Sequence, residues 1–187
     1  FHIASTGRPG PVLVDITRSA QVEEFEYHWP VELKLPGYEP VFEPVPRQIA
    51  RAAEEIARAQ APVLYVGGGL VRARAEEELR RLVELSDAPV VTTLPARGAF
   101  PDSDPHNLKM PGMHGTVPAV GALQRADLIV ALGARFDDRV TGQLDSFAPR
   151  ARIVHIDIDL AEMSKNRYAD VAVVADLKPA LAALNSA

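Results

Sequence analysis

Short aliphatic runs alternate with amphipathic stretches along most of the chain beyond residue 46. The aliphatic runs are short and apolar throughout, which is typical of parallel strands that are buried on both faces. They predict five strands, at 62–66, 89–93, 127–132, 152–157 and 171–175. Apolar residues at helical spacing predict helices at 47–59, 75–85, 117–124 and 177–184. This alternation predicts a doubly wound, Rossmann-like α/β fold, in which helices cover both faces of one parallel sheet.

The first 45 residues have a different pattern. A run at 12–16, Val-Leu-Val-Asp-Ile, predicts one buried strand without a partner nearby. The prolines that follow are Pro30, Pro36, Pro40, Pro44 and Pro46. They are spaced too closely for a helix to persist between them, so residues 19–45 predict an extended connector. Its interleaved aromatic residues favour packing against a surface over the alternative of a disordered linker. We therefore divide the chain into the strand of a preceding domain (1–18), the connector (19–45) and the main domain (46–187).

The strand at 62–66 stops at three consecutive glycines, Gly67, Gly68 and Gly69. Without Cβ atoms the backbone can turn sharply and bring bare N–H groups close to another molecule. A simple chain reversal is the alternative, but one glycine would suffice for it. The glycines therefore favour a nucleotide-contacting turn between a strand and a helix, although the G-x-G-x-x-G dinucleotide motif is absent.

Polar and charged groups gather where the other predicted strands end, which is where ligands of parallel sheets bind. Asp157 has two interpretations: it accepts a ribose hydroxyl, or it caps the helix that follows. Asp176 is the stronger helix-cap candidate, because Pro179 fits a first helical turn. The segment 135–139 places two guanidinium groups around two adjacent carboxylates. These charges are expected to pair with one another and with an anionic ligand, and the alternative is a purely surface role.

Composition limits the function classes. The 187 residues are 47% hydrophobic and 24% charged, with no Cys, so the chain is expected to be one globular α/β domain with an appendage and without disulfides. The net charge of −5 argues against nucleic-acid binding, and no run approaches a membrane span of about 20 apolar residues. The isolated His114 in the irregular loop 96–115 predicts no metal site. Because the chain begins with Phe1 and no signal peptide follows, we expect a piece of a longer polypeptide.

Several motifs occur in the same order in one known family. They are Gly-Arg-Pro-Gly-Pro-Val-Leu-Val-Asp at 7–15, the three glycines at 67–69, Met-His-Gly at 113–115, the segment 133–142 and His-Ile-Asp-Ile-Asp at 155–159. The string Arg-Phe-Asp-Asp-Arg-Val-Thr-Gly at 135–142 is the most specific of them. On these motifs the sequence resembles the catalytic subunits of the acetolactate synthase family, also called acetohydroxyacid synthases, along essentially its whole length.

The resemblance implies a central FAD-binding domain, preceded by the last strand of a pyrimidine-binding domain (1–18) and the interdomain connector. In this family FAD takes no part in the net redox chemistry. By motif match, the implied FAD-contacting positions are Arg8, Gly67, Gly68, Gly69, Thr93, Leu94, Met113, His114, Gly115, Gly133, Arg135, Asp137, Arg139, Val140, Asp157, Ile158, Glu162 and Asp176. Asp138 and Arg139 match positions that border the substrate channel of the family.

The resemblance also implies an activity that this chain cannot perform alone. The family condenses two pyruvates, or pyruvate with 2-oxobutyrate, with loss of CO2 in branched-chain amino acid biosynthesis. Its thiamine diphosphate and Mg²⁺ are held by other domains, and this chain has no Gly-Asp-Gly motif that would anchor them. A cytoplasmic homo-oligomer with a regulatory subunit is implied. The alternatives are the central domain of another thiamine-diphosphate enzyme, binding ADP or no nucleotide, and a stand-alone nucleotide-binding regulatory module.

Overall fold

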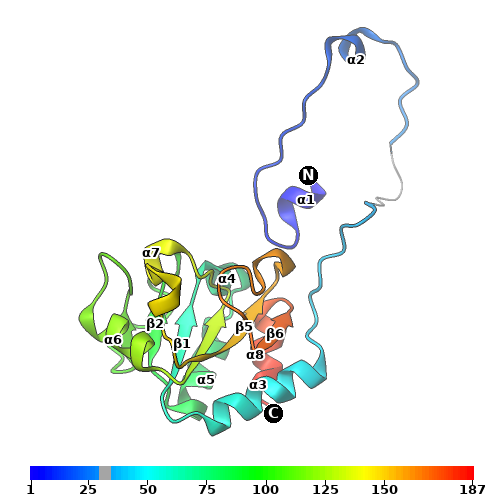
Figure 1. Cartoon of the computed structure of the whole chain (residues 1–187). Helices are drawn as coiled ribbons and strands as arrows, with labels where there is room; N and C mark the ends of the chain where they lie inside the picture. Colours follow the sequence, from blue (N-terminus) through cyan, green and yellow to red (C-terminus); the bar gives the residue numbers. More distant parts are fainter. Residues whose placement is uncertain (30–34) are drawn as a thin grey trace. The chain divides into compact units, whose positions relative to one another are not determined.

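The computed structural model describes residues 1–29 and 35–187, which form two compact units, Phe1–Pro40 and Val41–Ala187 (Figure 1). The second unit begins at Val41 rather than at residue 46, and the backbone N–H of Asp176 donates to the Phe42 carbonyl (2.9 Å). Residues 30–34 of the predicted connector, including Pro30, lie outside the described residues. The assignment of 1–18 to a preceding domain and of 19–45 to a connector stays a prediction.

The first unit contains two short helices, α1 (His2–Ser5) and α2 (Arg18–Val22), and otherwise irregular backbone. Thr6 and the Tyr38 hydroxyl form a hydrogen bond of 2.9 Å within it. Residues 12–16, predicted as a buried strand, form no strand, and Leu13 is 92% exposed. A strand needs a neighbouring backbone to pair with, and no described segment supplies one. The aromatic side chains of Phe25 and Trp29 are also largely exposed, so the packing expected for them is not seen.

The second unit is built on one six-stranded, all-parallel sheet, which confirms the predicted fold class. Its strands are β1 (Pro62–Val66), β2 (Val90–Thr92), β3 (Asn107–Lys109), β4 (Leu128–Leu132), β5 (Arg152–Asp157) and β6 (Val171–Val174). The spatial order is β3-β2-β1-β4-β5-β6. This is the order of doubly wound nucleotide-binding folds, and the direction of winding reverses between β1 and β4.

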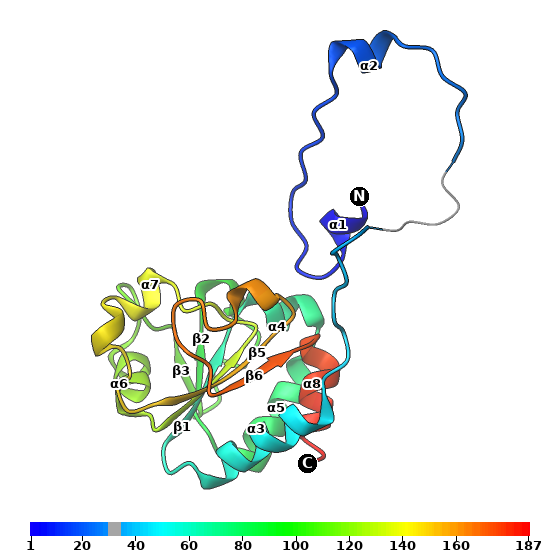
Figure 2. The same cartoon turned by 45° about the vertical axis from the view of Figure 1, so that its right-hand side comes forward.

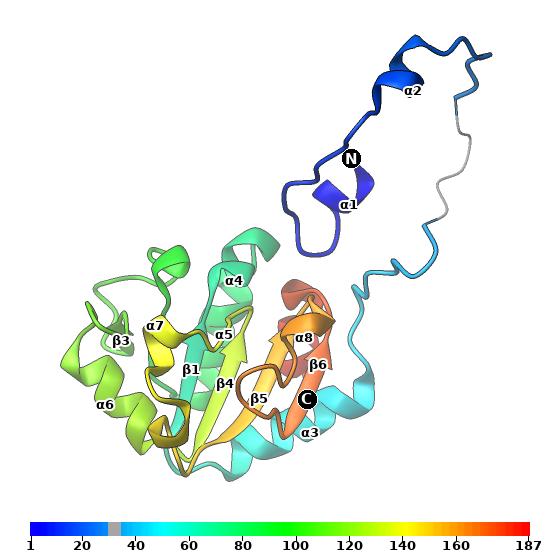
Figure 3. The same ribbon diagram turned by 45° about the horizontal axis from the view of Figure 1, so that its top comes forward.

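Helices cover both faces of the sheet (Figures 1 and 3). They are α3 (Pro46–Arg58), α4 (Gly68–Ala73), α5 (Glu76–Ser86), α6 (Val117–Arg125), α7 (Asp138–Thr141) and α8 (Leu177–Leu184), with 3₁₀ turns at Leu94–Ala96, Leu144–Ser146 and Leu160–Glu162. Successive side chains of a strand point to opposite faces. Leu64 and Val66 therefore pack with α3, α5 and α8, whereas Tyr65 packs with Leu123 of α6 on the other face.

The sixth strand, β3, was not predicted, because its three residues lie in a loop rich in proline and contain the poor strand formers Asn and Lys. Tertiary pairing decides it. The Val90 N–H donates to the His106 carbonyl (2.8 Å), and the Asn107 side chain anchors the segment. The helix α4 begins at Gly68, as the predicted strand-to-helix turn requires, but its extent was not predicted. The short helix α7 was missed, because it has no room for an amphipathic repeat.

Candidate nucleotide site

The ends of β1 and β4 meet at the point where the winding reverses. The Gly67 N–H donates to the Leu132 carbonyl (2.9 Å), and the Gly69 N–H donates to the Gly133 carbonyl (3.1 Å). A Cβ atom on Gly67 would lie 2.1 Å from the Gly133 oxygen, and one on Gly69 would lie 2.7 Å from the Gly133 Cα. Gly133 itself has a φ of +58°, which favours glycine. Close packing of two chain turns thus gives these glycines a structural reason within the fold.

The neighbouring turn after β2 closes over the same place. A Cβ atom on Gly68 would lie 2.9 Å from the Pro95 Cβ, in the 3₁₀ turn that begins at Leu94. The Thr93 N–H donates to the Val66 carbonyl (2.8 Å), which ties this turn to β1, while the Leu94 side chain is exposed. Three strand ends are therefore brought together at one edge of the sheet.

The charged segment after β4 forms the rim of this edge. Arg135 contacts Asp137 at 3.5 Å, and Arg139 contacts Asp138 at 3.8 Å, so the predicted pairing within the segment is present. Asp137 caps α7 by accepting from the Arg139 N–H (3.2 Å). An uninterrupted helix from residue 135 would place both guanidinium groups on one helix face. Because α7 begins only at Asp138, Arg135 lies outside the helix and the two groups do not share a face.

The loop that carries Met113 and His114 packs against α7. Gly112 has a φ of +91°, and a Cβ atom there would lie 2.4 Å from the Arg139 carbonyl oxygen. Gly115 is equally tight, since its Cβ would lie 2.3 Å from the Met110 carbonyl oxygen. Gly112 lets the loop approach α7 closely, and Gly115 lets the loop fold tightly on itself. The Met113 and His114 side chains remain exposed. The structure thus brings Gly112, next to Met113, against Arg139 and Val140, which are distant in sequence.

The ends of β5 and β6 add carboxylates to the same edge. The nearly buried Asp157 accepts from the Asp159 N–H (2.9 Å), and Asp159 in turn caps the turn that contains Glu162. Asp159, and not Asp157, is the N-cap of this 3₁₀ turn, so the helix-cap interpretation of Asp157 is wrong. The role of Asp157 toward a ribose stays a prediction. Asp176 caps α8 by accepting from the Lys178 N–H (2.9 Å), which confirms its helix-cap interpretation.

All but one of the predicted cofactor-contacting residues thus lie at or after strand ends of the second unit. Figure 2 shows α4 and α7, the helices that come after β1 and β4. Val140 and Ile158 follow the same strand ends, β4 and β5. Arg8 belongs to the first unit, and its part in the site stays a prediction.

Two residues beneath the site were not singled out from the sequence. The buried Tyr65 hydroxyl donates to the Arg135 carbonyl (3.0 Å), and the buried His155 Nε2–H donates to the Ala134 carbonyl (3.0 Å). Burial raises the pKa of Tyr65 and lowers the pKa of His155, so both side chains are neutral donors at neutral pH. A polar side chain at an inward position of an aliphatic strand is the signal that could have identified them.

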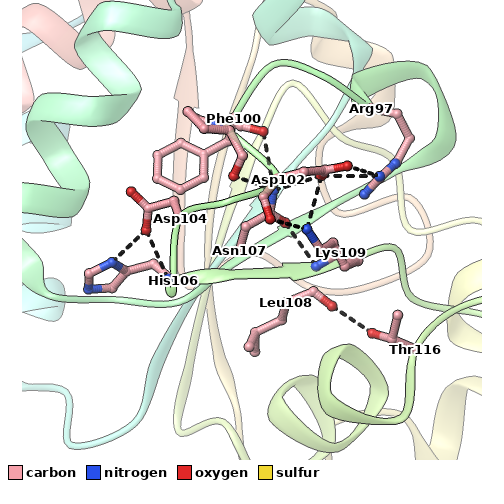
Figure 4. A network of polar contacts seen from close by, with 10 residues as sticks. Arg97, Phe100, Asp102, Asp104, His106, Asn107, Leu108, Lys109 and Thr116 are labelled. Carbon is pink, nitrogen blue, oxygen red and sulfur yellow. Dashed lines mark hydrogen bonds and ion pairs between the residues drawn. The ribbon is translucent and has the colours of Figure 1, made fainter.

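A second polar cluster lies on the segment 97–109 (Figure 4). Together with Asp87, which contacts His106, we call it the polar clasp: its other members are Arg97, Asp102, Asp104, His106, Asn107 and Lys109. Asp102 bridges Arg97 (2.9 Å) and Lys109 (3.2 Å), and these hydrogen bonds, that of Lys109 first, lower the pKa of its carboxyl. His106 lies between Asp87 (2.8 Å) and Asp104 (2.9 Å), which raise the pKa of its imidazole. Among the described residues, no group of three or more acidic, His or Cys side chains is arranged to hold a metal ion.

Comparison with known proteins assigns the family. The model of the thiamine pyrophosphate enzyme central domain matches residues 49–184. The chain belongs to this family. Thiamine diphosphate is the cofactor that gives the family its name. In the part of the chain that the structure describes, no helix is long and apolar enough to cross a bilayer.

Relatives of this central domain are named acetolactate synthases. The chain is 60% identical over 184 residues to the acetolactate synthase large subunit IlvB1 of Mycobacterium tuberculosis, covering 98% of this chain and 30% of the relative. It is 56% identical to the acetolactate synthase large subunit of Corynebacterium glutamicum, covering 98% of this chain and 29% of that protein. It is 50% identical to the chloroplastic acetolactate synthase 1 of Zea mays, covering 100% and 29%. Since the chain spans about 30% of their length, it corresponds to part of a larger protein with other domains.

Proposed function

We propose that this chain is the FAD-binding central domain of an acetolactate synthase large subunit. The observation that carries the proposal is 60% identity over 98% of the chain to a protein of that name. The complete enzyme would condense two pyruvates, or pyruvate and 2-oxobutyrate, with loss of CO2 in branched-chain amino acid biosynthesis. The cytoplasm, a homo-oligomer and a regulatory subunit belong to the same proposal.

The residues at the sheet edge fit a flavin dinucleotide. A pyrophosphate needs positive charge at the place where the winding reverses, and Arg135 and Arg139 lie there with side chains that are 52% and 80% exposed. Each is paired with a carboxylate on its own segment, which holds the guanidinium without consuming all of its donors. Asp157 would accept from a ribose hydroxyl, and the exposed Leu94 and Met113 would supply apolar contacts.

The division of labour between domains follows from the same proposal. Thiamine diphosphate supplies the carbanion chemistry, and the protein must hold it together with Mg²⁺. Those sites would lie in the other domains of the polypeptide, so the chain alone would make no acetolactate. Its own residues would bind FAD, and Asp138 and Arg139 would border the substrate channel.

The test is FAD titration into the complete polypeptide. A charge-assisted hydrogen bond contributes about 1.5 to 3 kcal/mol, and about 1.4 kcal/mol is tenfold in affinity. Arg135→Ala is therefore expected to weaken FAD binding about 10- to 100-fold, and Arg139→Ala to weaken it less but to lower kcat/KM for pyruvate more. Arg58→Ala is the matched control, because Arg58 pairs with Glu54 on α3, away from the strand ends.

The outcomes separate the candidate functions. Unchanged FAD affinity with a lowered Tm would mean that the arginines only neutralise Asp137 and Asp138. Wild-type protein that binds ADP but not FAD would point to the central domain of another thiamine-diphosphate enzyme. Binding of either nucleotide by a protein without carboligase activity would instead favour the stand-alone regulatory module.

A further inference from the structure

We propose that Tyr65, Phe136 and His155 form a buried aromatic support that holds the Arg135 loop (residues 134–137) ready for the dinucleotide. Tyr65 and His155 are then positioning residues of the nucleotide site. The inference rests on the proposed function, because it assigns these residues a part in FAD binding. The side chains of the support are not among the predicted cofactor-contacting residues. They form a layer beneath those residues.

The register of the sheet creates the place for this support. Tyr65 of β1 and His155 of β5 both pair with Ala131 of β4, so the three side chains lie in one row across the sheet. The central member, Ala131, is small and leaves space between its neighbours. Phe136 folds back toward this row, with its ring centroid 5.6 Å from the Tyr65 ring and 5.6 Å from the His155 ring. The His155 contact is edge-on, at an interplanar angle of 83°, which is a favourable aromatic geometry.

The polar atoms of the support fix the backbone above it. Tyr65 Oη–H donates to the Arg135 carbonyl and His155 Nε2–H donates to the Ala134 carbonyl, each at 3.0 Å. Two consecutive carbonyls are therefore held from two different strands. With Phe136 pointing inward, the exposed side chain of Arg135 and the half-exposed side chain of Asp137 lie on either side of it at the rim.

A purely structural core would not need these side chains. Burying a hydroxyl and an imidazole costs free energy unless they are hydrogen-bonded, and aliphatic residues would fill the same volume without that cost. His155 Nδ1 is buried, and no hydrogen-bond partner for it lies among the described residues. The bond that His155 does make is to the loop. A loop ordered before binding loses less conformational entropy when FAD arrives, so the support is expected to raise FAD affinity.

The experiment compares three variants of the complete polypeptide. Tyr65→Phe removes the hydroxyl and keeps the ring, His155→Leu removes the donor, and His155→Gln keeps an N–H donor near the Nε2 position. We expect FAD dissociation constants about 5-fold higher for Tyr65→Phe and about 10-fold higher for His155→Leu, because each lost hydrogen bond frees one loop carbonyl. His155→Gln should return to within about 3-fold of wild type. Amide hydrogen exchange at residues 134–140, without FAD, should become faster in the same order.

Ile153→Val is the control for stability alone, because Ile153 lies on the same sheet face and in the same apolar cluster but does not bond to the loop. It should lower Tm and leave FAD affinity unchanged. If wild type binds FAD and all three variants bind it as tightly as wild type does, the positioning role is overturned while the proposed function stands. If wild type binds no FAD, both fall. Should His155→Leu fail to fold, Tyr65→Phe still decides the question, because it removes one of the two hydrogen bonds to the loop and keeps the ring.

Discussion

Two loops of the second unit are held in place by different physics. The Arg135 loop rests on buried aromatic side chains, and the two hydrogen bonds that fix it come from neutral groups inside the sheet. The segment 97–109 is held by the polar clasp, whose ion pairs are partly exposed. His155 and His106 exemplify the contrast: the side chain of the first is buried, and that of the second is 31% exposed.

The difference shows how each loop can respond to conditions. Partly exposed ion pairs contribute little stability each and are screened by salt. Buried aromatic contacts and neutral hydrogen bonds are not screened by salt. They are sensitive instead to changes in the volume of the packed side chains. The loop that carries the proposed nucleotide site is therefore expected to respond less to salt than the polar clasp does.

Overpacking beneath the site should have the largest effect. Gly67 has an ordinary φ of −110°, so alanine could adopt this backbone conformation. The cost of Gly67→Ala comes instead from a steric clash, because its Cβ would lie 2.1 Å from the Gly133 oxygen. We expect a loss of about 3 kcal/mol of unfolding free energy, measured by urea denaturation. Gly121→Ala on α6 is the matched control, because its Cβ would meet only the flexible Arg125 side chain. That variant should be neutral or stabilising, and an equal loss in both would contradict the packing argument.

The polar clasp should depend on its one buried member. Asn107 donates to the Phe100 carbonyl (3.1 Å) and the Pro101 carbonyl (3.0 Å) and accepts from the Lys109 N–H (2.9 Å). Asn107→Ala leaves these buried groups without partners, and should cost about 2 kcal/mol of unfolding free energy. Arg97→Met, which breaks only the partly exposed pair with Asp102, should cost at most about 0.5 kcal/mol. Similar losses in both variants would show that the ion pair, rather than Asn107, holds the segment.

The two histidines should respond to pH in opposite directions, with the smallest of the three effects. Hydrogen bonds to Asp87 and Asp104 raise the pKa of His106, so its stabilisation is complete below about pH 6.5 and is lost as pH rises through the raised pKa. Burial lowers the pKa of His155 despite the nearby Asp157 and Glu162, so its contribution is complete above about pH 6.5 and is lost as pH falls through the lowered pKa.

Melting curves between pH 5 and 8.5 would separate the two contributions. Asp87→Asn should flatten only the alkaline side of the Tm profile, by a few degrees at most, because the His106 pair is partly exposed. His155→Gln should flatten the acid side. An acid side that depends on Asp87, or an alkaline side that depends on His155, would contradict the assigned pKa directions.

The sequence alone determined the repeating elements and the edge of the sheet at which the proposed site lies. Five strands and four helices were predicted within a few residues, because their aliphatic runs and helical stripes are long enough to set local structure. The parallel arrangement follows from the same alternation, and it places the glycines at 67–69 and the charged segment 135–139 at one edge.

Tertiary structure alone decided which parts of that edge touch. The interlocking of Gly67 with Gly133, and of Gly112 with Arg139, joins backbone segments far apart in the sequence, and no local pattern encodes such a contact. The strand β3 exists because β2 offers it a partner, whereas the apolar run at 12–16 has no such partner among the described residues and forms no strand. From the sequence, Tyr65 and His155 are only strand residues. The register of the sheet places Ala131 between them and so creates the space above it. Local propensity specifies an element, but pairing and packing with distant backbone determine whether it forms and what it supports.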